Sequence, residues 1–174
     1  MKKIIWSGIS IIVLGLCAFL FNYLTLQLPI KNKIKTDPRN DGVNICIHYK
    51  YYLIPSQIVF DIRSISGSNA PVDVFRVFLQ SAEALQNKKI NKVELASKGK
   101  TKFYITGAYF KTLGDDYGSQ NAIYTTRTFP ENLYLSDGAK AYEEWSGGIF
   151  GVLNKQMEDF NNACKKWFLE DFNN

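Results

Sequence analysis

The chain has 174 residues, of which 46% are hydrophobic and 14% aromatic, and it carries a formal net charge of +5. This composition excludes a wholly disordered chain, and the length suits one ordinary domain with a short extension. Three cysteines and one histidine, with no CxxC pair and no Cys/His ligand spacing, exclude a zinc-binding domain.

The amino-terminal segment is the most distinctive part of the sequence. No charged residue occurs between Lys3 and Lys31, and a helix over residues 4–28 would be roughly 37 Å long, against roughly 30 Å for the hydrocarbon core of a bilayer. A cleaved signal has a shorter apolar region that ends in small residues, whereas Ala18 has bulky Leu16 two positions before it. We therefore predict an uncleaved transmembrane helix that contacts the membrane over residues 4–28. A cleaved signal peptide is the alternative.

The basic residues around this helix give conflicting information on its orientation. Lys2 and Lys3 favour a cytoplasmic amino terminus and an exported domain. A second basic group, which favours the reverse, follows the helix: Lys31, Lys33, Lys35 and Arg39. The short basic start resembles a Sec-type signal anchor. We therefore predict a single-pass protein of the bacterial inner membrane with a periplasmic domain, and a cytoplasmic domain is the alternative.

The rest of the chain divides into a linker and one domain. We predict an anchor over residues 1–30, a polar linker over 31–42 and a single soluble domain over 43–172. Alternating apolar residues predict the first two strands, over 43–49 and 57–65.

A helix should follow from Pro71, which suits a first helical turn, to about Asn87. A hairpin of strands 91–97 and 101–107 comes next, and then a short helix over 107–114.

The last third of the chain is more mixed. Residues 122–129 are rich in β-branched and aromatic residues and predict a strand, which Pro130 ends, and a short helix is expected over 138–145. The last helix has an apolar stripe made of Ile149, Leu153, Met157, Phe160, Cys164, Trp167 and Phe168. This order of elements predicts an α+β domain with an antiparallel or mixed sheet packed by helices.

Positive charge gathers in the middle of the chain. Residues 51–111 have a net charge of +5, whereas residues 112–174 have −5. Seven lysines lie around a single acid, Glu94: Lys88, Lys89, Lys92, Lys98, Lys100, Lys102 and Lys111. Lys98, Lys100 and Lys102 lie on the predicted hairpin turn and are candidate binding residues for anionic lipid headgroups or an acidic partner. The alternative is a solvated hairpin. Nucleic acid is an unlikely partner, because no binding motif accompanies the lysines.

An acidic loop offers a second candidate site. Asp115 and Asp116 lie between glycines, and Arg127 follows among hydroxyl side chains, so the three residues could form a polar pocket. This pocket would suit a membrane-tethered hydrolase or metal-dependent enzyme. EF-hand spacing is absent, so we predict no metal site and no cofactor.

No catalytic constellation is visible. The one histidine, His48, lies two residues from Cys46 on a predicted strand, where an ordinary packing role is expected. Cys46 and Cys164 could form a disulfide if the domain is exported. The sequence therefore favours a membrane-anchored, non-catalytic binding domain with a protein or envelope partner, of which an immunity or inhibitor protein would be one form.

Overall fold

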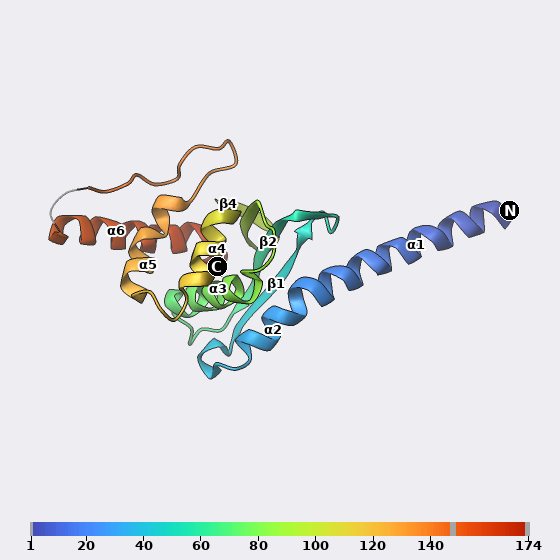
Figure 1. Cartoon of the computed structure of the whole chain (residues 1–174), viewed down its shortest axis with the longest axis horizontal. Helices are drawn as coiled ribbons and strands as arrows, with labels where there is room; N and C mark the ends of the chain where they lie inside the picture. Colours follow the sequence, from blue (N-terminus) through green and yellow to red (C-terminus); the bar gives the residue numbers. More distant parts are fainter. Residues whose placement is uncertain (1, 147–148, 173–174) are drawn as a thin grey trace.

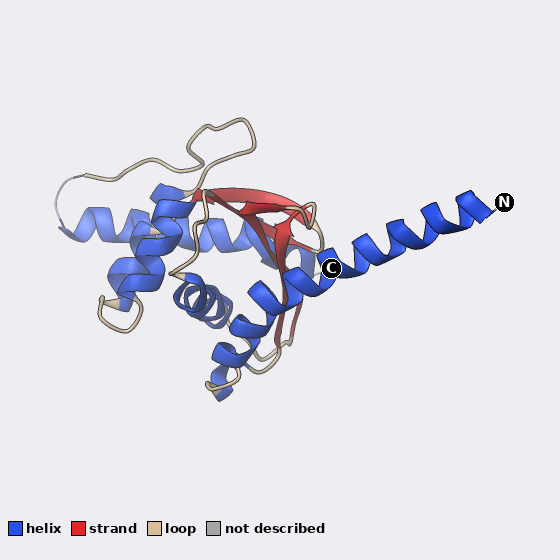
Figure 2. Ribbon diagram, turned by 45° about the vertical axis from the view of Figure 1, so that its right-hand side comes forward, coloured by secondary structure: helices blue, strands red, loops and turns tan. Residues whose placement is uncertain are grey.

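A computed structural model describes residues 2–146 and 149–172 and has a mixed α+β fold (Figure 1). A four-stranded mixed sheet is packed by helices, as the sequence predicted. One long amino-terminal helix runs out of this domain, with the amino terminus far from the sheet (Figures 1 and 2).

The amino-terminal helix has three consecutive parts. Helix α1 (Lys2–Asn22) passes through a π-helical turn, η1 (Tyr23–Gln27), into α2 (Leu28–Ile34). Within the described residues, Ile12–Ile34 is the one helical stretch that is long and apolar enough to cross a membrane. In α1 large apolar side chains face outward, and Leu14 and Leu16 are 69% and 59% exposed.

The sheet has the order β1-β2-β3-β4. Strands β1 (Val43–Lys50) and β2 (Ile54–Ile65) form one antiparallel pair, and β3 (Lys92–Ser97) and β4 (Lys100–Thr106) form another. Strands β2 and β3 are parallel, and α3 (Pro71–Leu85) joins them as a crossover between the two antiparallel pairs.

One short helix precedes the sheet in sequence, and the other remaining helices follow it. They are η2 (Pro38–Asn40) before β1, then α4 (Gly107–Asp116), α5 (Ala122–Thr128), η3 (Pro130–Asn132), α6 (Ile149–Cys164), η4 (Lys165–Leu169) and α7 (Glu170–Phe172). Aromatic side chains from α3 and η4 pack on one face of the sheet, where the ring of Phe60 lies 5.1 Å from Phe78 and 6.0 Å from Trp167. The predicted stripe of the last helix is confirmed at its buried members Phe160, Cys164, Trp167 and Phe168, whereas the side chain of Ile149 lies outside the described residues.

Two predicted elements are wrong. Residues 122–128 form helix α5 and not a strand. The side chain of Asn121 accepts a hydrogen bond from the Ile123 amide and caps this helix, and the Thr128 hydroxyl donates to the Tyr124 carbonyl one turn earlier. Local hydrogen bonds therefore outweigh the β-propensity of these residues.

The second error concerns the predicted helix over 138–145. Residues 138–145 contain no helix; a tight turn around Gly138, at a φ of 92°, brings Lys140 back to pair with Tyr134, which itself pairs with Tyr104 of β4.

Candidate functional site

Two amide side chains attach the amino-terminal helix to the edge of the sheet: Asn22 at the end of α1 and Gln27 at the end of η1. The Asn22 side chain accepts a hydrogen bond from the Tyr49 amide (2.7 Å) and donates to the Tyr52 carbonyl (2.9 Å). The Gln27 side chain accepts from the Ile47 amide (2.8 Å) and donates to the Ile45 carbonyl (3.2 Å). These bonds satisfy backbone groups of the edge strand β1 that another chain could otherwise pair with.

Apolar packing accompanies these hydrogen bonds. Leu26 and Ile30 are 0% exposed and belong to the same core as the sheet and α3. The large apolar side chains of this helix are therefore exposed in α1, whereas those of Leu26 and Ile30 are buried in the domain core.

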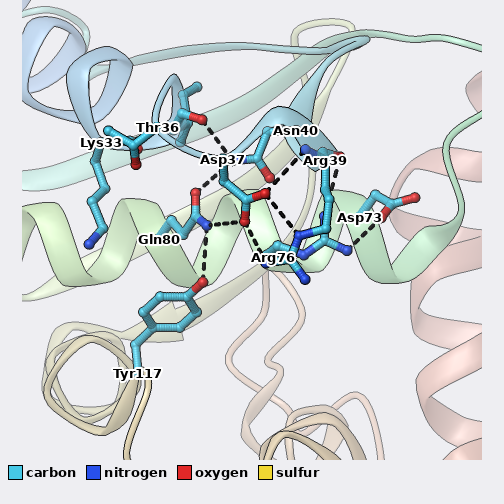
Figure 3. Close-up of polar contacts among 10 residues, drawn as sticks. Lys33, Thr36, Asp37, Arg39, Asn40, Asp73, Arg76, Gln80 and Tyr117 are labelled. Atoms are coloured by element: carbon cyan, nitrogen blue, oxygen red, sulfur yellow. Dashed lines mark hydrogen bonds and ion pairs between the residues drawn. The ribbon is translucent and has the colours of Figure 1, made fainter.

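The segment predicted as a linker holds a network of polar contacts, which we call the junction network (Figure 3). Asn40, which is buried, donates to the Gln80 side chain of α3 (2.7 Å), and Gln80 donates to Asp37 (3.2 Å) and to the Tyr117 hydroxyl (3.0 Å). Arg39 donates twice to Asp37, at 2.8 and 2.6 Å. Residues 37–40 are therefore fixed on α3 and the end of α4.

Charge complementarity strengthens the junction network. The guanidinium of Arg39 donates to both carboxylate oxygens of Asp37 and holds the pKa of that carboxyl well below its usual range. For Asp73, burial acts to raise the pKa, but hydrogen bonds from the Ala70 amide and from Arg76 outweigh it, so the pKa lies below its ordinary value. Both carboxylates are consequently stabilised in their charged form.

The face of the sheet opposite the aromatic core, which we call the polar face, carries a second polar cluster. Glu94 is buried and accepts from Lys50 (2.6 Å) and Thr101 (2.9 Å). The ammonium of Lys92 lies 3.9 Å from the ring centre of Tyr104, and that ring stacks on Tyr134 at 5.3 Å. A cleft of about 380 Å³ opens here, lined by Lys50, Lys92, Glu94, Thr101, Lys102, Phe103, Tyr104, Leu135, Ser136 and Asp137.

The charge of Glu94 is set by its neighbours. Burial acts to raise its pKa, but hydrogen bonds from Lys50 and Thr101 and the positive charges of Lys50 and Lys92 outweigh burial and lower the pKa. Glu94 is thus an ionised, hydrogen-bonded carboxylate and a poor general acid at neutral pH. A carboxylate held by a lysine, beside cation–aromatic pairs, suits recognition of a partner more than proton transfer.

The predicted lysine site lies at one end of the sheet. Because β2 and β3 are parallel, the β3–β4 turn lies at the end opposite the β1–β2 turn (Tyr51–Leu53), which α1 approaches through Asn22. We call the end with the β1–β2 turn proximal and the other end distal. At the distal end Lys98 and Lys102 both contact Asp171 near the end of the last helix, whereas Lys100 is exposed.

The acid loop and Arg127 have separate partners. Asp115 pairs with Lys111 at 2.5 Å within α4, and Asp116 ends that helix. Arg127 donates to Gln156 at 3.1 Å and lies over the Tyr124 ring. Across residues 2–146 and 149–172, no hydrogen bond or ion pair joins Arg127 to either aspartate, and no three His, Cys, Asp or Glu side chains gather as metal ligands.

The two cysteines of the domain are free thiols on opposite faces of the sheet. Cys46 pairs with Asp61 on the polar face, whereas its neighbour Ile47 pairs with core-facing Phe60. Cys164 is buried in the core beside Trp167. The sheet therefore separates the two sulfur atoms, and the structure does not bring them together for a disulfide.

Sequence reasoning missed the amides of the amino-terminal helix and the junction network. A signal for the amides was present, since Asn22 and Gln27 are polar residues inside an apolar segment.

No protein-family model, curated protein or solved structure matches the chain.

Proposed function

We propose that the chain is a membrane-anchored, non-catalytic binding protein, in which α1 spans the membrane and the domain meets a protein or envelope partner. The observation that carries this proposal is the division of the amino-terminal helix into an exposed apolar part and a docked part.

The dimensions of α1 support a membrane span. The 20 residues of α1 before Asn22 extend about 30 Å at 1.5 Å per residue, close to the roughly 30 Å of a hydrocarbon core. The docked residues from Asn22 onward lie just outside that length. A span over α1 followed directly by the domain would therefore leave no free tether, and the domain would be held at a fixed height above the bilayer.

An exported domain is part of the proposal. Lys2 and Lys3 begin α1, whereas Lys31 lies nine residues beyond Asn22, about 14 Å along the helix, and Lys33 forms an ion pair with Glu83 at 2.8 Å. Among the lysines of the amino-terminal helix, Lys2 and Lys3 therefore lie nearest the span, and they favour a cytoplasmic amino terminus.

The surface that we assign to partner binding is the cleft on the polar face. Lys92 and Tyr104 present a cation and an aromatic ring together, and Ser136 and Asp137 form its rim. An acidic segment of a partner protein would fit this chemistry, because carboxylates pair with the lysine and apolar groups stack on the ring.

Two experiments test this function. First, the full chain with a reporter after Asn174 should remain in membranes after alkaline carbonate extraction, and a reporter active only outside the cytoplasm should give signal. A chain that is released by carbonate contradicts the anchor.

Second, a photo-crosslinking amino acid at Ser136, on the cleft rim, should capture a discrete partner in cells, whereas the same probe at exposed Asn154 on α6 should not. Lys92→Glu should abolish the adduct and Lys155→Glu, on α6, should leave it. If Lys92→Glu leaves the adduct intact, the cleft does not bind the partner.

A further inference from the structure

The β1–β2 turn projects from the proximal end of the sheet alongside α1 (Figure 1). Its residues are unusually apolar for an exposed turn: Tyr51 and Leu53 are 72% and 73% exposed. Between this turn and α1 lies an apolar groove of about 710 Å³. The groove is lined by Leu14, Gly15, Ala18, Phe19, Tyr51, Tyr52 and Leu53.

The turn has a backbone that such side chains do not favour. Tyr51 and Tyr52 both have positive φ, 52° and 61°, and the Leu53 amide donates to the Lys50 carbonyl at 3.1 Å. Positive φ at both central positions is typical of a type I′ turn, where Asn-Gly is the favoured sequence. Two tyrosines here cost stability, which indicates that their side chains serve a purpose other than turn formation.

Polar groups of the turn already have partners inside the protein. The Tyr52 amide donates to the Tyr49 carbonyl at 2.7 Å, and the Tyr52 carbonyl accepts from Asn22 at 2.9 Å. The ring of Tyr52 stacks on His48 at 4.5 Å. Backbone groups that are bonded internally lower the cost of placing a turn in a water-poor environment.

Lysines also lie at the proximal end of the sheet, near the start of β3 and the end of β4. Gln57 of β2 pairs with Lys92, the first residue of β3, and from Gln57 to Leu53 the strand advances about 13 Å at roughly 3.3 Å per residue. Lys88, Lys89 and Lys111 line a hollow near this level, where β3 begins and β4 ends. The polar layer of each leaflet is roughly 5–8 Å thick, so long lysine side chains could reach headgroups while the turn enters the acyl chains.

We propose that the β1–β2 turn is a second membrane contact, in which Tyr51, Tyr52 and Leu53 insert into the leaflet beside α1 and the proximal lysines contact anionic headgroups. This inference rests on the proposed membrane span of α1. A lipid bilayer is the occupant that the geometry favours, since the groove continues directly from the exposed apolar surface of α1. Two contacts would fix the tilt of the domain, which a single helix could not do alone.

Site-specific fluorescence in lipid nanodiscs tests the inference. Three full-length chains each carry an environment-sensitive thiol label at one position: native Cys17 in α1, Leu53→Cys in the turn, and Lys100→Cys at the distal end. Cys46 is replaced by Ser in all three, Cys17 is replaced by Ser in the last two, and buried Cys164 is retained. Aqueous iodide and lipids with a nitroxide on the acyl chain serve as the two quenchers.

The labels at positions 17 and 53 should both be quenched by the nitroxide lipid and be several-fold less sensitive to iodide than the label at position 100. A label at 53 that iodide quenches as strongly as the label at 100, while the label at 17 is protected, overturns the inference but leaves the anchor intact. A label at 17 that is open to iodide overturns the proposed function itself. Protection at 53 from both quenchers indicates that another protein covers the groove, which also overturns the inference.

Discussion

The amino-terminal helix runs without a break from α1 into η1 and α2, but these two regions have different surroundings. In α1 the apolar side chains are exposed, whereas in η1 and α2 the side chains of Leu26 and Ile30 are fully buried in the domain core. Docking begins at Asn22, the last residue of α1, whose side chain bonds the backbone of β1 as that of Gln27 does. Hydropathy alone therefore does not show where the exposed region of this helix ends and the docked region begins. Side-chain amides placed opposite an edge strand mark that boundary.

The largest expected difference between the two parts is in packing. Leu26→Ala and Ile30→Ala should each lower the free energy of unfolding by about 2–5 kcal/mol, because each substitution leaves a cavity in the core. Leu24→Ala, two residues from Leu26 and 58% exposed, and Leu16→Ala should change it by less than about 0.5 kcal/mol. Chemical denaturation of the detergent-solubilised full chain measures these values. Equal effects at Leu26 and Leu24 would show that the docked part does not belong to the core.

Hydrogen bonds should have the next largest effect. Gln27→Ala leaves the Ile47 amide and the Ile45 carbonyl without their partner, at a cost of about 1–3 kcal/mol. Hydrogen exchange at the Ile47 amide should accelerate. The matched control is Asn32→Ala, at an exposed position of α2, which should leave that exchange rate unchanged. Unchanged protection of Ile47 in Gln27→Ala would mean that the edge of β1 is protected by something other than this side chain.

The junction network predicts the pH dependence of the attachment. The pKa values of Asp37 and Asp73 are lowered in the folded protein, so their stabilising contribution is complete above the ordinary carboxylate pKa, about 4. It should be lost as the pH falls below about 4 through the lower folded-state values. Melting temperatures measured from neutral pH to strong acid should therefore fall less steeply for Asp37→Asn than for the parent chain.

The control for this pH dependence is Asp41→Asn, an exposed aspartate just beyond the network. The melting temperature of this variant should fall with decreasing pH as steeply as that of the parent chain. If Asp37→Asn also follows the parent chain, Asp37 does not stabilise the fold through its charge.

Much of the fold could be predicted from the sequence because it depends on local periodicity. The alternation in Val43–Lys50, the helical spacing in α3 and the stripe around Phe160 and Trp167 each reflect one buried face. Residues 122–128 could not be assigned in this way. Their composition suits a strand, but a strand needs a neighbour to pair with, whereas Asn121 supplies a helix cap locally.

The candidate site depended on contacts between distant residues and was therefore largely hidden. Asn40 and Gln80 are forty residues apart, and only the packing of α3 brings them together. Likewise, the sequence groups seven lysines in one cluster, but the β3–β4 hairpin places them at opposite ends of the sheet, and the parallel pairing of β2 and β3 decides which end lies beside the β1–β2 turn. The direction of a strand pair is a tertiary property that the spacing of lysines does not encode.

The smallest predicted effect concerns these two sets of lysines and extends the comparison from the helix to the membrane. Each proximal lysine near an anionic surface should gain about 1 kcal/mol at most. Acylation of Lys88, Lys89 and Lys111 should therefore be several-fold slower in nanodiscs with anionic lipid than in nanodiscs of neutral lipid. Lys100 at the distal end is the internal control and should react equally in both, and quantitative mass spectrometry of the acylated peptides gives all four rates. Because the four amines belong to the same molecules, differences in reagent or protein concentration cancel. If anionic lipid instead slowed acylation at Lys100 more than at the proximal lysines, the distal end would lie toward the bilayer. The orientation of the sheet that we infer from α1 would then be reversed.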